Sequence, residues 1–392
     1  MKTYEKTHPW INFTLNLNRA SHKLWLMLGE ASSKCAHVSG VPLLPATATE
    51  LSKLYLAKGA LATAAIEGNT LTEEEVSRHL EGKLDLPPSK AYLKQEIGNI
   101  LKACDIISDI LLDGRSADIT VDMVNHYNAL VLDGLELEEG VVAGEIRKHS
   151  VGVWTYRGAP AEDCPYLLER LCEWLNGFVP PSDDEKIVYG IIKAIICHVY
   201  LAWIHPFGDG NGRTARLLEF HILISCGVPD LSAQLLSNHY NMTRTEYYKQ
   251  LDASHKSGGD IFPFIMYALR GFIDGLSEQI ELIKHQQVIV HWKDYIHELF
   301  SNKDGKTEIR RRRLIIDMSS LEADLSSLSK TIPIHELRYI SPRIAEAYAG
   351  LTGKTLVRDV TALIRMGLAE KTKGGIRAKP ETMFAFLAPT LR

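Results

Sequence analysis

The sequence predicts a mainly helical protein with one short β-hairpin, followed by a C-terminal module of mixed α and β structure. Three observations lead to this prediction. Apolar residues recur at helical spacing through most of the first 285 residues. Around residues 146–156 the spacing changes to strict alternation, which is typical of strands. Beyond residue 306 the chain becomes basic, which indicates a separate unit.

We expect three regions along the chain. Residues 1–115 form an N-terminal helical region, residues 116–285 form a central helical core, and residues 286–392 hold a linker helix and the C-terminal module. A chain of 392 residues is long enough for two or three domains, each with its own core. The segment up to about Pro45 shows no clear period and is predicted to be irregular.

Helices are predicted wherever apolar residues repeat with the period of a helix. The first begins at Ala46 and ends near Gly68, a plausible C-cap, and Thr72 followed by Glu75 has the pattern of a capping box. The other helices that we expect in the first two regions span Tyr92–Leu112, Ile119–Leu132, Cys164–Phe178, Asp183–Ile204, Thr214–Ile224, Asn241–Ser254 and Phe262–Ile283.

One of these segments, Ile187–Ile204, is almost wholly apolar and approaches the length that spans a bilayer. It contains Lys193 and His198, and it ends directly at a polar loop. We therefore expect a buried central helix that other helices surround and that Pro206 stops.

The composition is that of an ordinary globular protein. Hydrophobic residues make up 45% and charged residues 23% of the chain, which excludes a mainly disordered protein. The six cysteines show no CxxC pair and no metal-finger spacing, so we expect reduced thiols. Residues Met1–Trp10 are polar and contain no apolar signal region, and we expect a cytoplasmic protein.

The densest group of chemically useful residues reads HPFGDGNGRTAR, from His205 to Arg216. Three glycines in five positions leave backbone N–H groups free to face a ligand, and the loop opens onto a helix N-terminus, which favours anions. Pro206 is expected to hold His205 in an extended conformation. A plain surface turn of Gly, Asp and Asn would not require a histidine and two arginines.

The side chains of this loop supply a base, a metal ligand and two cations. His205 titrates near neutral pH and can act as a base. Asp209 offers a hard oxygen ligand suited to Mg²⁺ that is shared with phosphate. Arg213 and Arg216 lie three residues apart near the helix start, where both would flank a bound anion. The residues alone predict a polyphosphate site for phosphoryl or nucleotidyl transfer.

His205 through Arg213 match the signature HPFx[DE]GN[GK]R position for position, and on this motif the chain resembles the Fic family. The resemblance implies a mainly helical Fic fold and a protein adenylyltransferase that uses Mg-ATP and releases pyrophosphate. His205 would take the proton from a Ser, Thr or Tyr hydroxyl of a protein substrate. The nucleotide-binding residues that it implies are Phe207, Gly208, Gly210, Asn211, Gly212, Arg213, Arg216, Tyr247 and Tyr248.

The roles that the resemblance implies are specific. Phosphates would lie on the N–H groups of Gly210–Gly212 with Asn211 near the α-phosphate, and Arg213 and Arg216 would hold the terminal phosphates. Tyr247 and Tyr248 would help to form the nucleobase pocket. In this chain His255 stands near the place of a family Asn, and core packing of both tyrosines is the alternative.

A second stretch, Thr63–Gly68, matches the pattern [ST]xxxE[GN]. From its position alone, Glu67 is expected to be a surface carboxylate at the C-terminal end of a helix, where the helix dipole disfavours a negative charge. The pattern resembles the inhibitory motif that precedes the core in one class of Fic proteins, with Thr63 as its first residue. The resemblance implies that Glu67 pairs with Arg216 and withdraws it from the γ-phosphate. In some relatives the same glutamate supports removal of AMP, so a bifunctional enzyme stays open.

The hairpin predicted at Ile146–Tyr156 is bounded by Gly144 and Gly158. In the Fic family a hairpin at this place, the flap, lies over the active site and holds the target segment by strand-like pairing. The resemblance therefore implies that Val151, Gly152 and Val153 belong to such a flap.

The last third of the chain differs in charge. From Lys306 to Arg392 there are 16 lysines and arginines against 9 acids, a net of +7, which leaves −11 for the rest. Predicted elements are helices at Ile340–Ala349 and Leu356–Met366 around a turn at Thr352–Thr355, then strands at Leu368–Lys371 and Ile376–Lys379. This order resembles a winged helix, with Thr355, Arg358 and Arg365 on its recognition helix. The module could bind DNA, or dock or dimerise with protein.

Two other functions stay open beside the adenylyltransferase. One is a transcription regulator in which the winged helix binds DNA and the core only senses nucleotide. The other is the same core transferring UMP or phosphocholine, since the loop recognises phosphates and not the attached group. Expected partners are ATP, a protein substrate that could be the chain itself, and a second copy in a homodimer, but no membrane.

Overall fold

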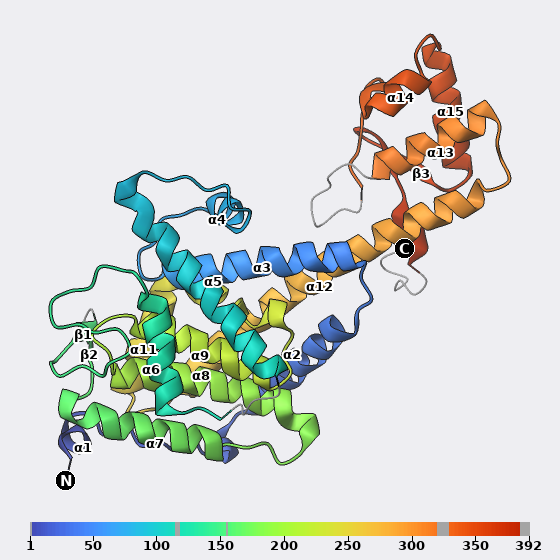
Figure 1. Cartoon of the computed structure of the whole chain (residues 1–392). Coiled ribbons are helices and arrows are strands. Elements are labelled where there is room, and N and C mark those ends of the chain that lie inside the picture. The colour runs from blue at the N-terminus through green and yellow to red at the C-terminus, as the bar shows by residue number, and fades with distance from the viewer. Residues whose placement is uncertain (1, 114–117, 154–155, 320–328, 385–392) are drawn as a thin grey trace. The chain divides into compact units, whose positions relative to one another are not determined.

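The computed structural model describes residues 2–113, 118–153, 156–319 and 329–384, and these are mainly helical (Figure 1). Contacts divide the chain into two compact units, Met1–Gln279 and Ile280–Arg392. The 38-residue helix α12, Phe262–Leu299, begins in the first unit and ends in the second. It is longer than the predicted Phe262–Ile283, because it continues without a break through the expected linker helix.

The helices of the first unit follow the predicted order closely. They are α1 (Thr3–Thr7), α2 (His22–Gly40), α3 (Pro45–Ala65), α4 (Glu73–Leu80), α5 (Ala91–Leu112), α6 (Val121–Leu132), α7 (Cys164–Gly177), α8 (Lys186–Ile204), α9 (Asn211–Ser225), α10 (Leu235–Met242) and α11 (Arg244–Lys256). The capping box at Thr72 is confirmed, since its hydroxyl accepts from the Glu75 N–H and the Glu75 carboxylate accepts from the Thr72 N–H. Helix α10 was not predicted, and six of its eight residues lie between the predicted helices Thr214–Ile224 and Asn241–Ser254.

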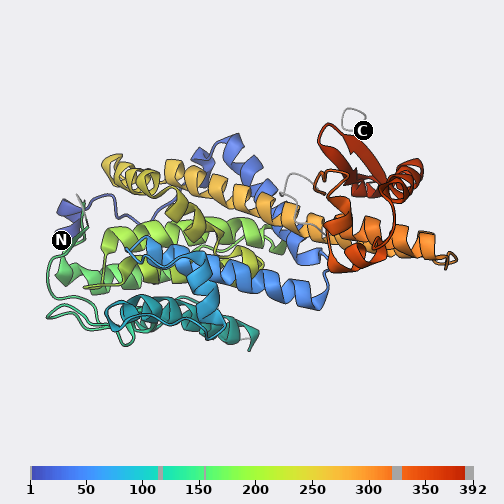
Figure 2. The same cartoon turned by 90° about the horizontal axis from the view of Figure 1, so that it is seen from above.

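Helices α8 and α9 lie side by side at the centre of the first unit (Figures 1 and 2). Helix α8 also contacts α2 and α7, and α9 also contacts α3, α5 and α6. Nearly every residue from Gly190 to Ile204 is buried, so the prediction of a buried central helix is confirmed. Among the described residues, Asp183–Ile204 is the one stretch with the length and composition to cross a bilayer, and most of it is buried inside the protein.

The prediction of an irregular segment up to Pro45 is wrong. Helix α2 occupies much of it, and its first turn is capped by Ser21, whose hydroxyl accepts from the Leu24 N–H. Its buried face repeats at intervals of four and three residues and comprises Leu24, Leu28, Ala31, Cys35 and Val38. That face packs against α8, so tertiary burial stabilises a helix whose period was present in the sequence.

The predicted hairpin exists but is shorter. Strands β1 (Gly152–Val153) and β2 (Tyr156–Arg157) pair antiparallel, with Gly152 opposite Arg157. The alternation that we expected to start at Ile146 is not a strand there, because Ile146 forms a bridge with Phe207 of the motif loop instead. Trp154 and Thr155 lie outside the described residues.

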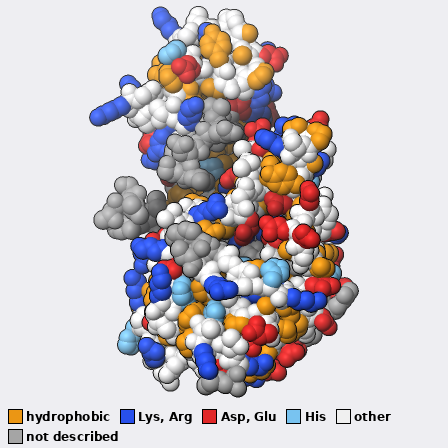
Figure 3. Space-filling view, turned by 90° about the vertical axis from the view of Figure 1, so that its left-hand side faces the viewer, with side chains coloured by type: hydrophobic (Ala, Val, Ile, Leu, Met, Phe, Trp, Pro, Cys, Tyr) orange, Lys and Arg blue, Asp and Glu red, His pale blue; other side chains and the backbone are white. Residues whose placement is uncertain are grey.

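The second unit contains α13 (Lys306–Ser319), α14 (Pro342–Ala347), α15 (Gly353–Arg365), β3 (Ala369–Thr372) and β4 (Gly375–Ala378). Strands β3 and β4 form an antiparallel hairpin, as predicted around Gly374–Gly375. The predicted turn at Thr352–Thr355 is wrong, since α15 already begins at Gly353. Residues 310–313 are four consecutive arginines. Two of them, Arg310 and Arg311, form ion pairs with the buried carboxylate of Asp359 and so have a structural role. Figure 3 shows acidic and basic side chains together on one face, in keeping with the net charge of −4.

Candidate active site at the start of helix α9

The motif loop turns into helix α9 at Gly210. Gly210 has φ +77°, a conformation that suits glycine, and α9 begins at Asn211 rather than at the predicted Thr214. The N–H of Thr214 is the first to bond back to the loop, at 2.9 Å from the Gly210 carbonyl, which leaves the N–H groups of residues 211–213 without helical partners. The N–H of Gly210 instead donates to the Asp209 carboxylate at 2.5 Å. The N–H groups that the helix start leaves available to an anion are therefore those of residues 211–213, one residue later than the expected Gly210–Gly212.

His205 ends α8 in a left-handed conformation, with φ 51° and ψ 58°. The predicted extended conformation is wrong, because His205 completes the last turn of the helix by donating its N–H to the Leu201 carbonyl at 2.8 Å. A histidine in this region before a proline is strained, and such strain is typical of functional sites. Gly158 makes room for it, since a Cβ there would lie 2.8 Å from the His205 Cβ.

Arg147 holds the strained histidine in place, and no sequence motif indicated it. Its buried guanidinium donates to four backbone carbonyls, those of His205 at 2.7 Å, His149 at 2.6 Å, Ala159 at 2.5 Å and Ile204 at 3.4 Å. Burial, together with the charge of Arg147, lowers the pKa of His205 to about 4. His205 is therefore neutral near pH 7 and able to accept a proton.

Two asparagines fix the loop between them. The Asn211 side chain accepts from the Phe207 N–H at 2.9 Å and donates to the Phe207 carbonyl at 2.8 Å. Asn128 of α6 donates to the Asp209 carbonyl at 2.9 Å. The amide that we expected beside the α-phosphate is thus engaged in shaping the loop itself.

Arg216 lies at the base of the site and is paired with Glu67. Its guanidinium donates to the Glu67 carboxylate at 2.5 Å and to the Thr63 carbonyl at 2.9 Å, so Thr63 contributes its backbone. The Arg216 side chain is 1% exposed and that of Glu67 is 34% exposed. Burial alone would raise the pKa of Glu67, but the charge and hydrogen bond of Arg216 hold it below its ordinary value. The predicted pairing is present in the structure.

Gly212 shows where the Glu67 carboxylate sits. A Cβ added at Gly212 would meet the Glu67 Oε1 atom at 2.1 Å and the Arg216 side chain at 3.1 Å. The carboxylate therefore lies against the first turn of α9, beside Gly212 and the Arg216 guanidinium. It lies at the helix start where we expect a phosphate from the sequence.

Arg213 is also held by carboxylates. It donates to Asp209 at 3.0 Å and to Glu96 of α5 at 3.0 Å. The second oxygen of Glu96 accepts from the Asn69 amide at 2.8 Å, and Asn69 follows Glu67 by two residues. Glu96 was not predicted, because it lies more than a hundred residues from Arg213 and only the fold brings them together. The turn that carries Glu67 is thereby anchored through α5 to a second arginine of the motif.

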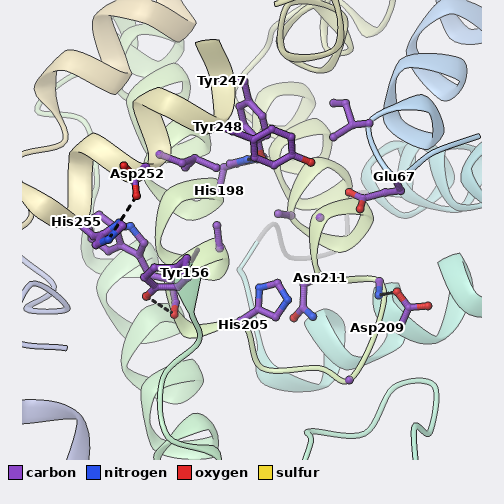
Figure 4. Close-up of a pocket in the computed structure, with 18 residues that line it drawn as sticks. Glu67, Tyr156, His198, His205, Asp209, Asn211, Tyr247, Tyr248, Asp252 and His255 are labelled. Atoms are coloured by element: carbon purple, nitrogen blue, oxygen red, sulfur yellow. Dashed lines mark hydrogen bonds and ion pairs between the residues drawn. The ribbon is translucent and has the colours of Figure 1, made fainter. Parts of the chain in front are cut away.

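The pocket above the loop is lined by side chains from α8, α9, α11 and the hairpin (Figure 4). Glu67 lies at one side, and Tyr156 and His255 lie at the opposite side, with His205 between them. Tyr247 lines the pocket and is also part of the core, since it is buried and its hydroxyl lies 2.8 Å from the His198 Nε2. Core packing of Tyr247 is therefore confirmed, while its contact with a nucleobase stays a prediction, and Tyr248 lines the same pocket.

Residues 118–223 match the family model described as the Fic/DOC family. The chain is 32% identical over 206 residues to the protein adenylyltransferase Fic of Nematostella vectensis, a match that covers 53% of this chain and 44% of that protein. It is 30% identical to the protein adenylyltransferase fic-1 of Caenorhabditis elegans, over 53% of this chain and 38% of that protein. The match thus spans less than half of the length of these relatives.

Solved structures show the same fold. A Fic family protein from Desulfovibrio desulfuricans G20 aligns with a TM-score of 0.56 at 20% identity, over 96% of this chain and 97% of that chain. A fragment of Fic-1 from C. elegans aligns with a TM-score of 0.53 at 26% identity, over 67% of this chain and 73% of that chain. The chain therefore contains a Fic domain, within residues 118–223, that belongs to the Fic/DOC family.

Proposed function

We propose that the protein is a protein adenylyltransferase that moves AMP from Mg-ATP to a Ser, Thr or Tyr hydroxyl, and that Glu67 inhibits it. One observation carries the proposal: a carboxylate paired with Arg216 lies against Gly212, in the first turn of α9. A site that holds an anion in this way suits a phosphate. Relatives that match about half of this chain are named protein adenylyltransferases.

The reaction follows from the charge and position of the groups. Neutral His205 accepts the proton of the target hydroxyl, whose oxygen attacks the α-phosphorus. The bond from that phosphorus to the bridging oxygen breaks, and pyrophosphate leaves. Arg213, Arg216 and the N–H groups of residues 211–213 stabilise the negative charge on the phosphates. The β1–β2 hairpin would hold the target segment beside the pocket.

Asp209 is the residue that would hold Mg²⁺. Its Oδ1 atom accepts from Gly210 and Arg213, while the side chain is 51% exposed, so the second oxygen faces solvent. The described residues contain no group of three or more His, Cys, Asp or Glu placed to hold a metal. Mg²⁺ is commonly bound by one or two carboxylates together with substrate phosphates and water, and Asp209 would supply such a carboxylate. Bound there, the ion would neutralise phosphate charge.

Inhibition is a competition for Arg216. Both of its hydrogen-bond partners, Glu67 and the Thr63 carbonyl, come from the end of α3 and the turn after it. A terminal phosphate of ATP would need the same guanidinium. A charge-assisted hydrogen bond is worth about 1.5–3 kcal/mol, which corresponds to roughly tenfold to hundredfold in the competent population.

The transferred group is tested with the Glu67→Gly variant, in which the competition is removed. Incubation with α-labelled ATP, α-labelled UTP or labelled CDP-choline in a cell lysate should label protein from ATP alone. Labelling from UTP or CDP-choline would show that this compound, and not ATP, is the donor. Labelling from none of the three would favour a regulator that only senses nucleotide. Incubating the AMP-labelled product with the native chain tests removal of AMP.

For the second unit we propose a winged-helix module that binds duplex DNA, with α15 as the recognition helix. Lys354, Arg358 and Arg365 are exposed and lie at intervals of four and seven residues, which places them on one face of α15. Helices of this size fit the major groove. Binding of a labelled duplex should weaken with salt and on Arg358→Ala with Arg365→Ala, and no binding at 50 mM salt would favour protein docking, including the homodimer.

A further inference from the structure

Residues 2–13, called the strap here, cross the first unit beside the active-site hairpin. No motif marks this segment. At one end the Tyr4 N–H donates to the buried carboxylate of Asp163 at 2.7 Å. At the other end the Tyr200 hydroxyl donates to the Asn12 side chain at 3.2 Å, and the Phe13 ring lies 5.3 Å from the Tyr200 ring. The strap is therefore fixed at both ends.

The middle of the strap holds strand β2 of the hairpin. The Nε2 atom of His8 lies 2.9 Å from the Arg157 carbonyl, and because a carbonyl only accepts, Nε2 carries the proton. The Nδ1 atom lies 2.8 Å from the Thr7 hydroxyl oxygen. Burial lowers the pKa of His8, in agreement with a neutral ring. His8 thus ties the strap to the strand that contains Tyr156.

Trp10 packs behind two residues that line the pocket. Its ring centroid lies 5.4 Å from that of His255 and 6.4 Å from that of Tyr156, and the rings of Tyr156 and His255 lie 4.8 Å apart. Tyr156 is further fixed because its hydroxyl donates to the Trp203 carbonyl at 2.9 Å. Tyr156 and His255 face the pocket, whereas Trp10 supports them from behind.

The turn after α11 is built to accept the strap. Gly258 and Gly259 have φ values of +76° and +93°, and a Cβ at Gly259 would lie 2.9 Å from the Trp10 carbonyl. A side chain at Gly259 would therefore strain the turn and push the strap away. Strap, hairpin and α11 meet where Trp10 contacts Tyr156 and His255. Tyr156 and His255 lie at the end of the pocket opposite Glu67 (Figure 4).

We infer that Trp10 and His8 are positioning residues that hold Tyr156 and His255 as an aromatic wall for the nucleobase. The inference rests on the proposed function, because it takes the ligand to be an adenine nucleotide. Since the phosphates would lie at the start of α9, where Glu67 now sits, the base would lie at the opposite end of the pocket. A flat, polarisable purine fits between aromatic surfaces of this kind.

The test is nucleotide affinity in the full chain, with Glu67→Gly as the parent so that the phosphate site is open. Calorimetric titration with Mg-ATP should show the Kd rise roughly threefold to tenfold on Trp10→Ala, the range expected for one lost aromatic contact. Trp10→Phe should restore most of the affinity. Gly259→Ala, which displaces the strap at Trp10 while leaving every strap residue in place, should match Trp10→Ala. The control Trp25→Ala removes a partly exposed tryptophan of α2 and should change nothing.

Kinetics separate positioning from general damage. We expect Trp10→Ala to raise the KM for ATP while kcat stays within about twofold, since the wall contacts the nucleotide and not the reacting atoms. An unchanged Kd, or a lower kcat at unchanged KM, would overturn the inference. Binding is measured without transfer, so a parent that binds ATP but transfers nothing contradicts the proposed function alone. A parent that does not bind ATP contradicts both.

Discussion

Replacing Glu67 should change ATP affinity by an amount that the structure allows us to work out. The pair joins Arg216, 1% exposed, to a carboxylate that is 34% exposed, at 2.5 Å. A charge-assisted hydrogen bond contributes about 1.5–3 kcal/mol, and partial exposure of Glu67 places it in the lower half of that range. A gain of about 1.5–2 kcal/mol corresponds to roughly tenfold to thirtyfold tighter ATP binding. Glu67→Gln, which keeps a hydrogen bond but loses the charge, should lie between native and Glu67→Gly.

Titration with ATP and with AMP distinguishes this account from a general loosening of the pocket. AMP lacks the terminal phosphates that would need Arg216, so its affinity should be similar in native protein and Glu67→Gly. The reasoning would be refuted if AMP affinity rose as much as ATP affinity, or if neither changed. Removal of Glu67 also leaves a buried guanidinium without its carboxylate. The variant should therefore unfold at a lower temperature than native protein without nucleotide, and ATP should restore the difference.

Four other predictions follow from the contacts. Asn69→Ala should raise the rate of AMP transfer about threefold with Glu67 intact, because it removes the hydrogen bond to Glu96 that holds the Glu67 turn and leaves Arg216 unchanged. An unchanged rate would show that this hydrogen bond does not contribute to inhibition. Gly212→Ala should abolish ATP binding even together with Glu67→Gly, because the new methyl group would fill the space beside Arg216 that the Glu67 carboxylate now occupies. Calorimetric titration with Mg-ATP measures this, and retained binding would contradict it. Because the pKa of His205 is lowered to about 4, its neutral form persists down to about pH 5. The rate of AMP transfer should therefore fall only as the pH drops through 4. A fall centred near pH 6.5 in a pH–rate profile would contradict this. Asp359→Ala should lower the free energy of unfolding of the second unit by about 3 kcal/mol, because Arg310 and Arg311 lose a buried partner. Urea denaturation measures this change, with Asp304→Ala as the control substitution.

The helices were predictable where burial and period agree. Helix α8 shows this best, since its apolar run is surrounded by other helices. Helix α2 shows the limit: Leu24, Leu28 and Ala31 have helical spacing, but many polar and small residues between them hid it. Helix α2 is stabilised by the packing of that face against α8, which local sequence does not reveal. The hairpin was located correctly, but its predicted start at Ile146 was too early. Ile146 forms an isolated bridge with Phe207 of the motif loop and is not part of the hairpin.

The site was predictable as far as local sequence determines it. The loop glycines, Asp209 and the paired arginines follow from spacing alone, and the Glu67 pairing followed from a motif. Arg147 and Glu96 could not be found in this way, because each acts on residues more than fifty positions away. The left-handed backbone of His205 was also missed, since the local preference imposed by Pro206 loses to the helix end and to Arg147. The strap was invisible for the same reason, because its partners are distant rings.

The rate of AMP transfer from α-labelled ATP, compared between native protein, Glu67→Gly, and Glu67→Gly with His205→Ala, tests the central claim most directly. The account predicts that the first substitution raises the rate roughly tenfold or more and that the second abolishes it, with ATP binding retained. Equal rates in native protein and Glu67→Gly would contradict inhibition by Glu67. Transfer that survives His205→Ala would contradict the role of His205 as the base.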